Sequence, residues 1–231
     1  MIEFHEIQLE IFKTLLFSQA LRFSELLPGE MENSQFNFHL ARLIELGYVQ
    51  KVEQKYSLTT VGKELANRVQ AVSGKIELQA KITTVLCAIQ DNGPYTKVLL
   101  YNRLKHPFYS CQGFPTEKVR PGEDIYEAAS RGLKEETGLI GIPILFAIRH
   151  YRVFLYTNDL VEDKLMHAFL FKNPTGKLIT NHEGNAFWVD KRDVKSFVKK
   201  PLLEFNDFYN AILNFRGNIS FEEKKMITEN F

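Results

Sequence analysis

The residues best able to do chemistry lie between Gly113 and Gly138, in the run GFPTEKVRPGEDIYEAASRGLKEETG. Near its end stand Glu135 and Glu136, with Arg131 four positions before the first of them and Glu123 in the turn that precedes. Residues three and four apart share a helix face, so Arg131 can hold a carboxylate in a fixed orientation. Clustered carboxylates beside a turn are ligands that Mg²⁺ prefers, while water and substrate phosphate complete its octahedron. We therefore expect a divalent-cation site on a helix here.

The spacing of these residues resembles the Nudix box, which runs Gly, five residues, Glu, seven residues, Arg-Glu-apolar, one residue, Glu-Glu, one residue, Gly-apolar. The positions that match it without gaps are Glu123, Arg131, Leu133, Glu135, Glu136, Gly138 and Leu139. Many Nudix proteins place a further metal-binding Glu a few residues before a strand that contains Trp. Glu183 fits that position, because it lies five residues before Trp188 in the stretch HEGNAFWVD.

The resemblance implies an activity and a role for each of these side chains. Nudix proteins hydrolyse a nucleoside diphosphate linked to another group, with Mg²⁺ (or Mn²⁺) as the cofactor. By this resemblance Glu135, Glu136 and Glu183 hold the metal, and Glu183 is also a candidate base. The implied catalytic set is Glu135, Glu136, Arg131 and Glu123, in which Arg131 and Glu123 fix the geometry of the metal-binding carboxylates.

Two positions depart from the box. Glu117 stands where the family has Gly, and Gly132 stands where the family has the Glu that follows Arg. In the family that Glu binds metal and, in some members, activates the attacking water. Loss of a group that only supports a metal ligand costs about 10–100-fold in affinity or activity, so loss of a ligand should cost at least as much. A base could then come from Glu162, Asp163 or Glu183, and a gain of hydrolysis in Gly132→Glu would show that the pocket still accepts the chemistry.

Gly132 leaves two functional hypotheses open. A glycine inside a helix is less stable than alanine by about 0.5–1 kcal/mol, so it indicates either close packing or relaxed selection on catalysis. The first hypothesis, which we favour, is a hydrolase that is slow because one ligand is missing. The alternative is a non-catalytic Nudix domain that senses a nucleotide-like ligand within a transcriptional regulator, a kind of fusion known in the family. A scaffold with neither activity ranks last, because the other box carboxylates survive.

Residues 1–72 are typical of a separate, mainly helical domain. Hydrophobic periodicity and turn residues predict helices over 4–17, 23–27, 33–46 and 59–69 and short strands over 48–52 and 55–58. The segment HLARLIELGYVQKVEQKYSLTTVGKELA resembles the winged helix-turn-helix domains of bacterial and archaeal regulators. That resemblance covers residues 2–70 and predicts the fold better than it predicts the ligand.

The winged-helix resemblance implies binding to double-stranded DNA. The expected recognition helix and hairpin expose side chains that can bond base edges or phosphates. These residues are Ser34, Gln35, Asn37, His39, Arg42, Lys51 and Lys55. Against this, residues 1–75 hold eight Lys or Arg and nine Glu, whereas DNA-binding domains usually present a basic face. The alternative is a winged helix used for dimerisation or for contact with another protein. Of these interpretations we favour binding to DNA.

Residues 77–216 are predicted to form the domain that carries the box, with a boundary at 71–77 and a C-terminal tail over 217–231. Strands are expected over 81–89, 97–101, 144–154, 164–171 and 187–189, and helices over 125–137 and 202–215. The resemblance implies an α/β/α Nudix fold with a mixed β-sheet. The whole chain is therefore expected to be α+β.

Composition says more about the cellular compartment of the protein than about its function. The 231 residues carry 29 Lys or Arg and 28 Asp or Glu, and the net charge of +1 gives no general attraction to nucleic acid or membrane. Cys87 and Cys111 lack metal-ligand spacing and indicate reduced thiols. No apolar run approaches the ~18 residues of a membrane span, and the start MIEFHE lacks the features of a signal peptide. We expect a cytoplasmic protein without a membrane partner, and a homodimer because both domain types commonly dimerise.

Overall fold

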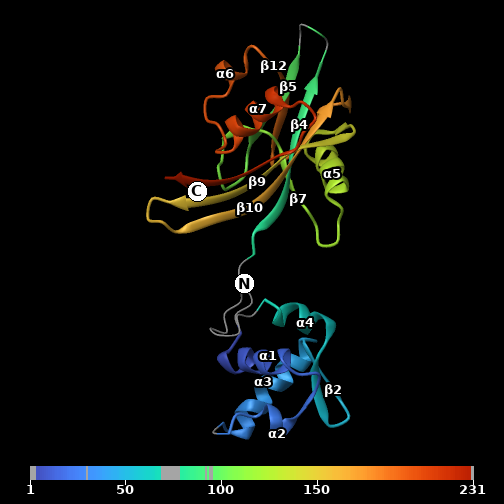
Figure 1. Cartoon of the computed structure of the whole chain (residues 1–231), viewed down its shortest axis with the longest axis vertical. Coiled ribbons are helices and arrows are strands. Elements are labelled where there is room, and N and C mark those ends of the chain that lie inside the picture. The colour runs from blue at the N-terminus through green and yellow to red at the C-terminus, as the bar shows by residue number, and fades with distance from the viewer. Residues whose placement is uncertain (1–3, 30, 69–78, 92, 94–95, 230–231) are drawn as a thin grey trace. The chain divides into compact units, whose positions relative to one another are not determined.

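The computed structural model describes residues 4–29, 31–68, 79–91, 93 and 96–229. The chain divides into two compact units, Met1–Leu78 and Gln79–Phe231, which Figure 1 shows as ribbons. The boundary predicted at 71–77 lies outside the described residues. Among the residues that are described, no helix combines the length and the apolar character needed to cross a membrane.

The N-terminal unit contains the helices and the hairpin that the sequence predicts. Its elements are α1 (Glu6–Leu16), β1 (Leu21–Arg22), α2 (Phe23–Leu26), α3 (Asn33–Glu45), β2 (Val49–Val52), β3 (Lys55–Leu58) and α4 (Thr60–Ala66). The three strands form one antiparallel sheet in the order β1-β3-β2. Apolar positions at helical spacing, including Phe12, Phe36, Leu40 and Leu43, are buried together in its core.

The C-terminal unit is built on a mixed sheet. The strands of this unit are β4 (Lys81–Gln90), β5 (Lys97–Arg103), β6 (Gln112–Gly113), β7 (Thr116–Lys118), β8 (Leu139–Ile140), β9 (Pro143–Leu155), β10 (Leu160–Lys172), β11 (Thr175–Gly176), β12 (Gly184–Asp190) and β13 (Ser220–Thr228). The helices of this unit are α5 (Ile125–Thr137), α6 (Val194–Phe197) and α7 (Phe205–Asn214). The main sheet runs β12-β5-β4-β10-β9-β13, while β6 pairs with β5 and β7 pairs with β4. β10 is parallel to β4 and β13 is parallel to β9, whereas the other pairs of this sheet are antiparallel.

The sheet is covered by helices on both faces. Successive side chains of a strand point to opposite faces, so Val85 and Cys87 pack with α7 residues such as Phe208, while Leu86 packs with Leu133 of α5. Figure 1 accordingly shows α5 on one side of the sheet and α7 on the other. The predicted α/β/α layering with a mixed sheet is therefore confirmed.

Helix α5 has the bounds that its sequence predicts, because both ends carry clear signals. The side chain of Asp124 accepts hydrogen bonds from the backbone N–H groups of Tyr126 and Glu127, which would otherwise lack partners at the helix start. Gly138 ends the helix with a φ of 77°, a left-handed conformation that glycine adopts without steric cost. This helix carries the box carboxylates.

The residues that the sequence analysis treats as a tail, 217–231, include an edge strand. β13 pairs with β9 along its whole length. Arg149 of β9 is only 2% exposed. Its guanidinium donates to Asp207 Oδ2 at 3.2 Å and to the carbonyl oxygen of Ser220 at 3.0 Å, and it lies 3.2 Å from Glu222 Oε1. The predicted tail is thus wrong for Ser220–Thr228, which complete the sheet and neutralise a buried cation.

We expect removal of residues 217–231 to destabilise the C-terminal unit. The deletion leaves β9 as an open edge and removes the acceptors that Ser220 and Glu222 offer to buried Arg149. A buried donor left without a partner costs about 1–3 kcal/mol. Urea unfolding followed by the fluorescence of Trp188, the single tryptophan, measures this loss. Removal of residues 230–231 alone is the control, and equal stability of the two truncated chains would contradict the structural role of β13.

Candidate active site

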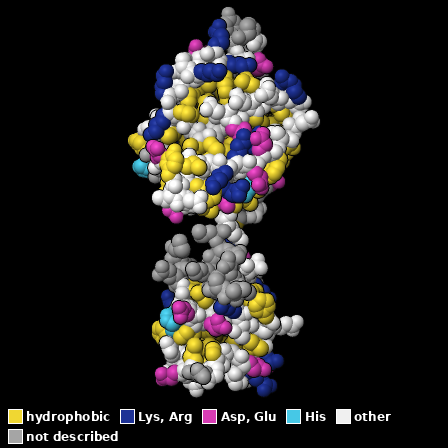
Figure 2. All heavy atoms as spheres, turned by 60° about the vertical axis from the view of Figure 1, so that its left-hand side comes forward, with side chains coloured by type: hydrophobic (Ala, Val, Ile, Leu, Met, Phe, Trp, Pro, Cys, Tyr) yellow, Lys and Arg dark blue, Asp and Glu magenta, His cyan; other side chains and the backbone are white. Residues whose placement is uncertain are grey.

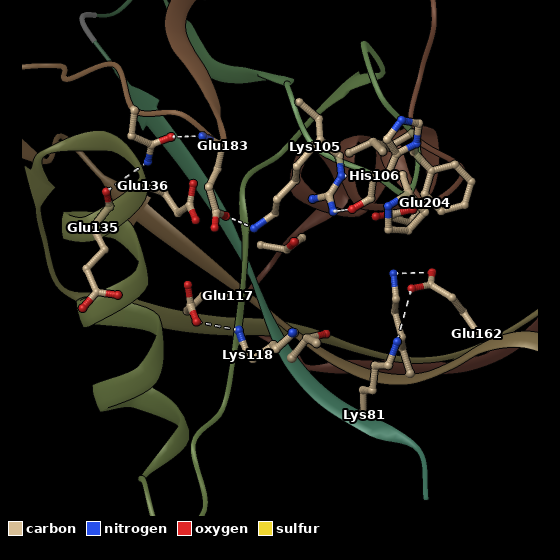
Figure 3. Close-up of a pocket in the computed structure, with 18 of the residues that line it drawn as sticks. Lys81, Lys105, His106, Glu117, Lys118, Glu135, Glu136, Glu162, Glu183 and Glu204 are labelled. Carbon is tan, nitrogen blue, oxygen red and sulfur yellow. Dashed lines mark hydrogen bonds and ion pairs between the residues drawn. The ribbon is translucent and has the colours of Figure 1, made fainter. Parts of the chain in front are cut away.

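A cavity of about 510 Å³ opens in the C-terminal unit beside the box helix. Strands β4, β7 and β10, helix α5 and the segments before β6 and β12 contribute to its walls. Carboxylates and cationic side chains line it together, and Figure 3 shows them facing a common space. Glu135, Glu136 and Glu183, which the sequence proposes as metal ligands, all lie on its wall.

Arg131 holds the acidic side chains around the box helix. Its guanidinium donates a forked pair of hydrogen bonds to Glu123, from Nε to Oε1 at 2.6 Å and from Nη2 to Oε2 at 2.9 Å. It also donates to Glu135 Oε2 at 2.9 Å and to the carbonyl oxygen of Lys118 at 3.0 Å. The pair of bonds from Arg131 to Glu123, with one from the backbone N–H of Arg120, lowers the pKa of the Glu123 carboxyl to about 2. Arg131 and Glu123 therefore act as positioning residues that join the turn, the strand and the helix.

Glu135 and Glu136 are adjacent in sequence but have different environments. Glu136 is 6% exposed and accepts a hydrogen bond of 2.7 Å from the hydroxyl of Tyr101. Burial and this carboxylate raise the pKa of Tyr101, so the hydroxyl remains a donor. Glu135 is half exposed and pairs with Arg131 and with Arg120 at 3.5 Å. In Figure 3 Glu136 points toward Glu183, while Glu135 points to the far side of the helix.

Glu183 is positioned by the loop that precedes β12. Its backbone N–H donates to Asn181 Oδ1 at 2.8 Å, and the Asn181 amide reaches the carbonyl oxygen of Glu135 at 3.4 Å. Its carboxylate forms an ion pair with Lys105. Burial lowers the pKa of the Lys105 ammonium, while the negative charges of Glu136 and Glu117 act to raise it. A cationic group thus already lies among three carboxylates from separate elements.

The donors of this cavity fit a hard divalent cation. Carboxylate oxygens are the ligands that Mg²⁺ and Mn²⁺ prefer, and the Lys105 ammonium shows that the space attracts positive charge. Thr83, 6% exposed, also lines the cavity, and its buried Oγ1 has no hydrogen-bond partner within the described part of the chain. As the described side chains lie, no three acidic, His or Cys groups converge as a metal site. A cation would therefore have to displace Lys105 from Glu183.

Gly132 is required by close packing. A Cβ atom at this position would lie 2.6 Å from Cβ and 2.9 Å from Cγ of Glu117, and 3.1 Å from Cδ1 of Leu86. Cβ atoms essentially never approach that closely, so no side chain fits at 132 while Glu117 is present. Gly132→Glu alone therefore does not restore the box, and a test of that change also requires a smaller residue at 117. Of the two explanations for Gly132, the structure supports close packing.

Two of the candidate bases, Glu162 and Asp163, lie on opposite faces of β10. Glu162 lines the cavity, but its carboxylate lies 2.5 Å from Lys164 Nζ and 3.8 Å from Lys81 Nζ. Asp163 points to the other face, as strand alternation requires, and pairs with His150 at 2.7 Å. Asp163 is therefore wrong as a candidate base, and Glu162 is neutralised by two lysines.

The structure contradicts one of the predicted DNA contacts in the N-terminal unit and leaves the other six exposed. Ser34, Gln35, Asn37, Arg42, Lys51 and Lys55 are exposed. His39 is 8% exposed and stacks on His5 with ring centroids 4.2 Å apart, and burial and His5 lower its pKa. His39 shares the inward face of α3 with Phe36 and Leu43, so its prediction as an exposed contact is wrong. On the face shown in Figure 2, acidic and basic side chains of this unit are mixed.

The residues at the cavity that sequence reasoning missed come from strands and loops outside the box. Tyr101 ends an apolar run of β5, and Lys105 follows two residues after that strand. Thr83 lies on β4, whose alternation places it on the cavity wall. Nothing in their local sequence marks them, because their roles depend on strands that are brought together only by the fold.

Comparisons with known proteins agree with this architecture. A family model described as NUDIX domain matches residues 80–208, and one described as Domain of unknown function (DUF7347) matches residues 4–69. No curated protein matches the chain. The crystal structure of the MutT protein from Bacillus halodurans is similar with 20% identity and a TM-score of 0.53, covering 65% of this chain and 93% of that one. The NUDIX domain of Shewanella oneidensis NrtR, complexed with ADP ribose, is similar with 15% identity and a TM-score of 0.52, covering 67% and 97%. At these identities the likeness concerns the fold.

We expect Glu123→Gln to lose stability near neutral pH and to lose less in acid. The folded-state pKa of Glu123 is lowered to about 2 from 4.5, so its contribution is complete above pH 4.5 and disappears as the pH falls toward 2. The difference in free energy of unfolding between wild type and variant should shrink over that range, as measured by urea unfolding at several pH values. Glu127→Gln, at an exposed position of the same helix, is the control. A difference that stays constant with pH would refute the role of the Arg131 pair.

Proposed function

The chain belongs to the Nudix family, and on that premise we propose that it hydrolyses a nucleoside diphosphate linked to another moiety with the help of Mg²⁺ or Mn²⁺. The observation that carries the proposal is the single cavity in which Glu135, Glu136 and Glu183 meet a set of cationic side chains. Acidic groups there suit a metal, and basic groups suit phosphate oxygens. A surface of mixed charge without a cavity would not provide this combination.

The acidic side of the cavity would hold the cation. Glu136 and Glu183 point toward each other, and Glu135 directly precedes Glu136 on α5. When bound, the cation neutralises phosphate charge and makes a coordinated water more acidic. Arg131 and Glu123 keep the helix and the preceding turn in place, and the Tyr101 hydroxyl fixes one oxygen of Glu136.

The basic side of the cavity would bind the diphosphate. Arg103, Lys105 and Lys118 line the cavity from the segments around β5 and β7. Arg103 is kept rigid because its Nε donates to the carbonyl oxygen of Pro107 at 2.6 Å. Lys105 has a flexible stem, so it can leave Glu183 for a phosphate oxygen once a metal neutralises that carboxylate. His106 and Phe108 line the adjacent wall, where a flat group of the substrate could pack.

We expect phosphate release from at least one substrate among nucleotide sugars, ADP-ribose and (d)NTPs with Mg²⁺ or Mn²⁺. Glu136→Gln should lower the rate by at least about 100-fold, because it removes a direct metal ligand whose charge no neighbour replaces. A colorimetric phosphate assay coupled to a phosphatase measures the release. Glu127→Gln should retain the wild-type rate. Wild-type release no faster than that of Glu136→Gln, for every substrate, would refute the hydrolase.

A second proposed function is a ligand-sensing Nudix domain in a DNA-binding regulator. The observation that favours it is the Lys105–Glu183 ion pair, which neutralises the Glu183 carboxylate without a metal. The N-terminal unit adds α3 and a β-hairpin with exposed polar and basic side chains, the order proposed for a winged helix. On this proposal the cavity binds the same class of ligand but leaves it intact, and the bound ligand alters the affinity for DNA. A ligand that raises the melting temperature and survives long incubation with metal would support sensing over hydrolysis.

We expect fluorescence anisotropy to detect binding of the full chain to a DNA fragment selected from random sequences. Lys51→Ala and Lys55→Ala should each weaken binding to all sequences and reduce the salt dependence by about one ion, because each removes a phosphate contact. Asn37→Ala should instead weaken binding to the selected sequence by about 1–3 kcal/mol, because it removes a base contact. Lys63→Ala, an exposed lysine of α4, serves as the control. Equal affinity of all four variants would exclude this surface.

A further inference from the structure

The two departures from the Nudix box occupy one place in the fold. Glu117 lies on β7 and Gly132 on α5, and the two elements pack so closely that a Cβ at 132 would lie 2.6 Å from Cβ of Glu117. The side chain of Glu117 therefore fills the volume that a side chain at 132 would fill. The chain has Glu where the box has Gly and Gly where the box has Glu, so the two positions have exchanged residues across a contact.

The carboxylate of Glu117 is held at the cavity wall. The β7–β4 pairing places Glu117 opposite Thr84, and Glu117 is among the residues that line the cavity. Its Oε1 accepts a hydrogen bond of 2.9 Å from the backbone N–H of Lys118 and lies 3.3 Å from Arg131 Nη1. Oε2 has no partner among the described residues. Arg131 therefore orients Glu117 together with Glu123 and Glu135 and leaves one oxygen free to bind a ligand.

Glu117 shares its electrostatic surroundings with Glu136 and Glu183. Figure 3 shows the three carboxylates on one side of the box helix, at the edge of the space that Lys105 enters. The charges of Glu136 and Glu117 both act on the Lys105 ammonium, which is paired with Glu183. Buried Thr83 Oγ1, unpartnered among the described residues, lines the same cavity. One cationic group thus already lies within reach of carboxylates from β7, α5 and the loop before β12.

We propose that Glu117 is a metal ligand of this site and supplies, from β7, the carboxylate that the Nudix box places on the helix at position 132. The inference rests on the proposed function and makes it more specific. The donor set would be Glu117, Glu136 and Glu183, with Glu135 adjacent, so the number of carboxylates around the cation is conserved although one comes from a different element. Gly132 is then a steric requirement of this arrangement.

Binding of Mn²⁺ to the full-length protein tests the inference, with the metal as the only ligand. Electron paramagnetic resonance of free Mn²⁺ or calorimetry gives the dissociation constant for each variant. Glu117→Gln keeps the shape and removes the charge, and it should weaken Mn²⁺ binding at least tenfold. Glu136→Gln should weaken it comparably, while Glu127→Gln, which removes an exposed carboxylate of the same helix, should not change it.

The reciprocal exchange provides a second, independent variant. Glu117→Gly removes the carboxylate and opens the contact, and it should weaken binding as Glu117→Gln does. Adding Gly132→Glu to Glu117→Gly returns both positions to the family pattern and should recover Mn²⁺ affinity to within a few-fold of wild type. Trp188 fluorescence during thermal unfolding verifies that each variant is folded, and Glu117→Gln decides the question if the double variant is not.

Each outcome is decisive. Wild-type affinity in folded Glu117→Gln, together with weakened binding in Glu136→Gln, would overturn the role of Glu117 and leave the proposed function intact. Absence of Mn²⁺ binding by the wild-type protein would overturn the proposed function, and this inference with it. Weakened binding in Glu117→Gln and Glu136→Gln, with the control unchanged, would support both.

Discussion

The guanidinium of Arg131 is the interaction on which the site depends. It is the one group in the box that contacts the turn, the strand and the helix at once, through Glu123, the carbonyl of Lys118 and Glu135. Several carboxylates within reach of one another repel, and a forked cation between them offsets that repulsion while fixing their positions. Without it, the described side chains of β7 would have no polar contact with α5, and the only ion pair left between the turn and α5 would be the longer one between Arg120 and Glu135. The bonds that hold the turn, the strand and the helix together are therefore the same bonds that position the carboxylates.

The same tie brings β7 so close to α5 that only one of two facing positions can carry a side chain. Glu117 and Gly132 share that contact, and a carboxylate can be supplied from either side of it. Seen along the chain, Gly132 looks like the loss of a ligand. In the folded chain, Glu117 on the strand provides the acidic group that the family pattern has on the helix, and Gly132 on the helix provides the glycine that the pattern has at position 117. Departures from a motif can thus be judged only when the residues that face them are known.

The sequence predicted what is encoded locally and missed what is set by pairing at long range. The bounds of α5 follow from Asp124 and Gly138, and the layered sheet follows from periodicity together with the family resemblance. β13 was missed because its run of Glu and Lys is typical of a solvated segment, and its partner β9 lies far earlier in the chain. His39 was assigned to the wrong face of a helix that was otherwise correct. The position of Lys105 in the cavity could not be predicted, because nothing in the local sequence of a loop lysine indicates which carboxylate it will pair with.

The mixture of charges in the cavity would also make the proposed binding of a cation and of an anion interdependent. Lys105 is paired with Glu183, and burial lowers the pKa of its ammonium while nearby carboxylates oppose that effect. A divalent cation bound among the same carboxylates would repel Lys105 and leave its charge uncompensated in a partly buried place. A diphosphate supplies the missing negative charge, so each ligand reduces the electrostatic penalty of binding the other, and linkage makes that effect reciprocal. The coupling would operate in a hydrolase and in a sensor alike. Under the proposed function, the charge arrangement therefore constrains the class of ligand, a phosphate-bearing anion with its metal, more strongly than it constrains what happens to the ligand once bound.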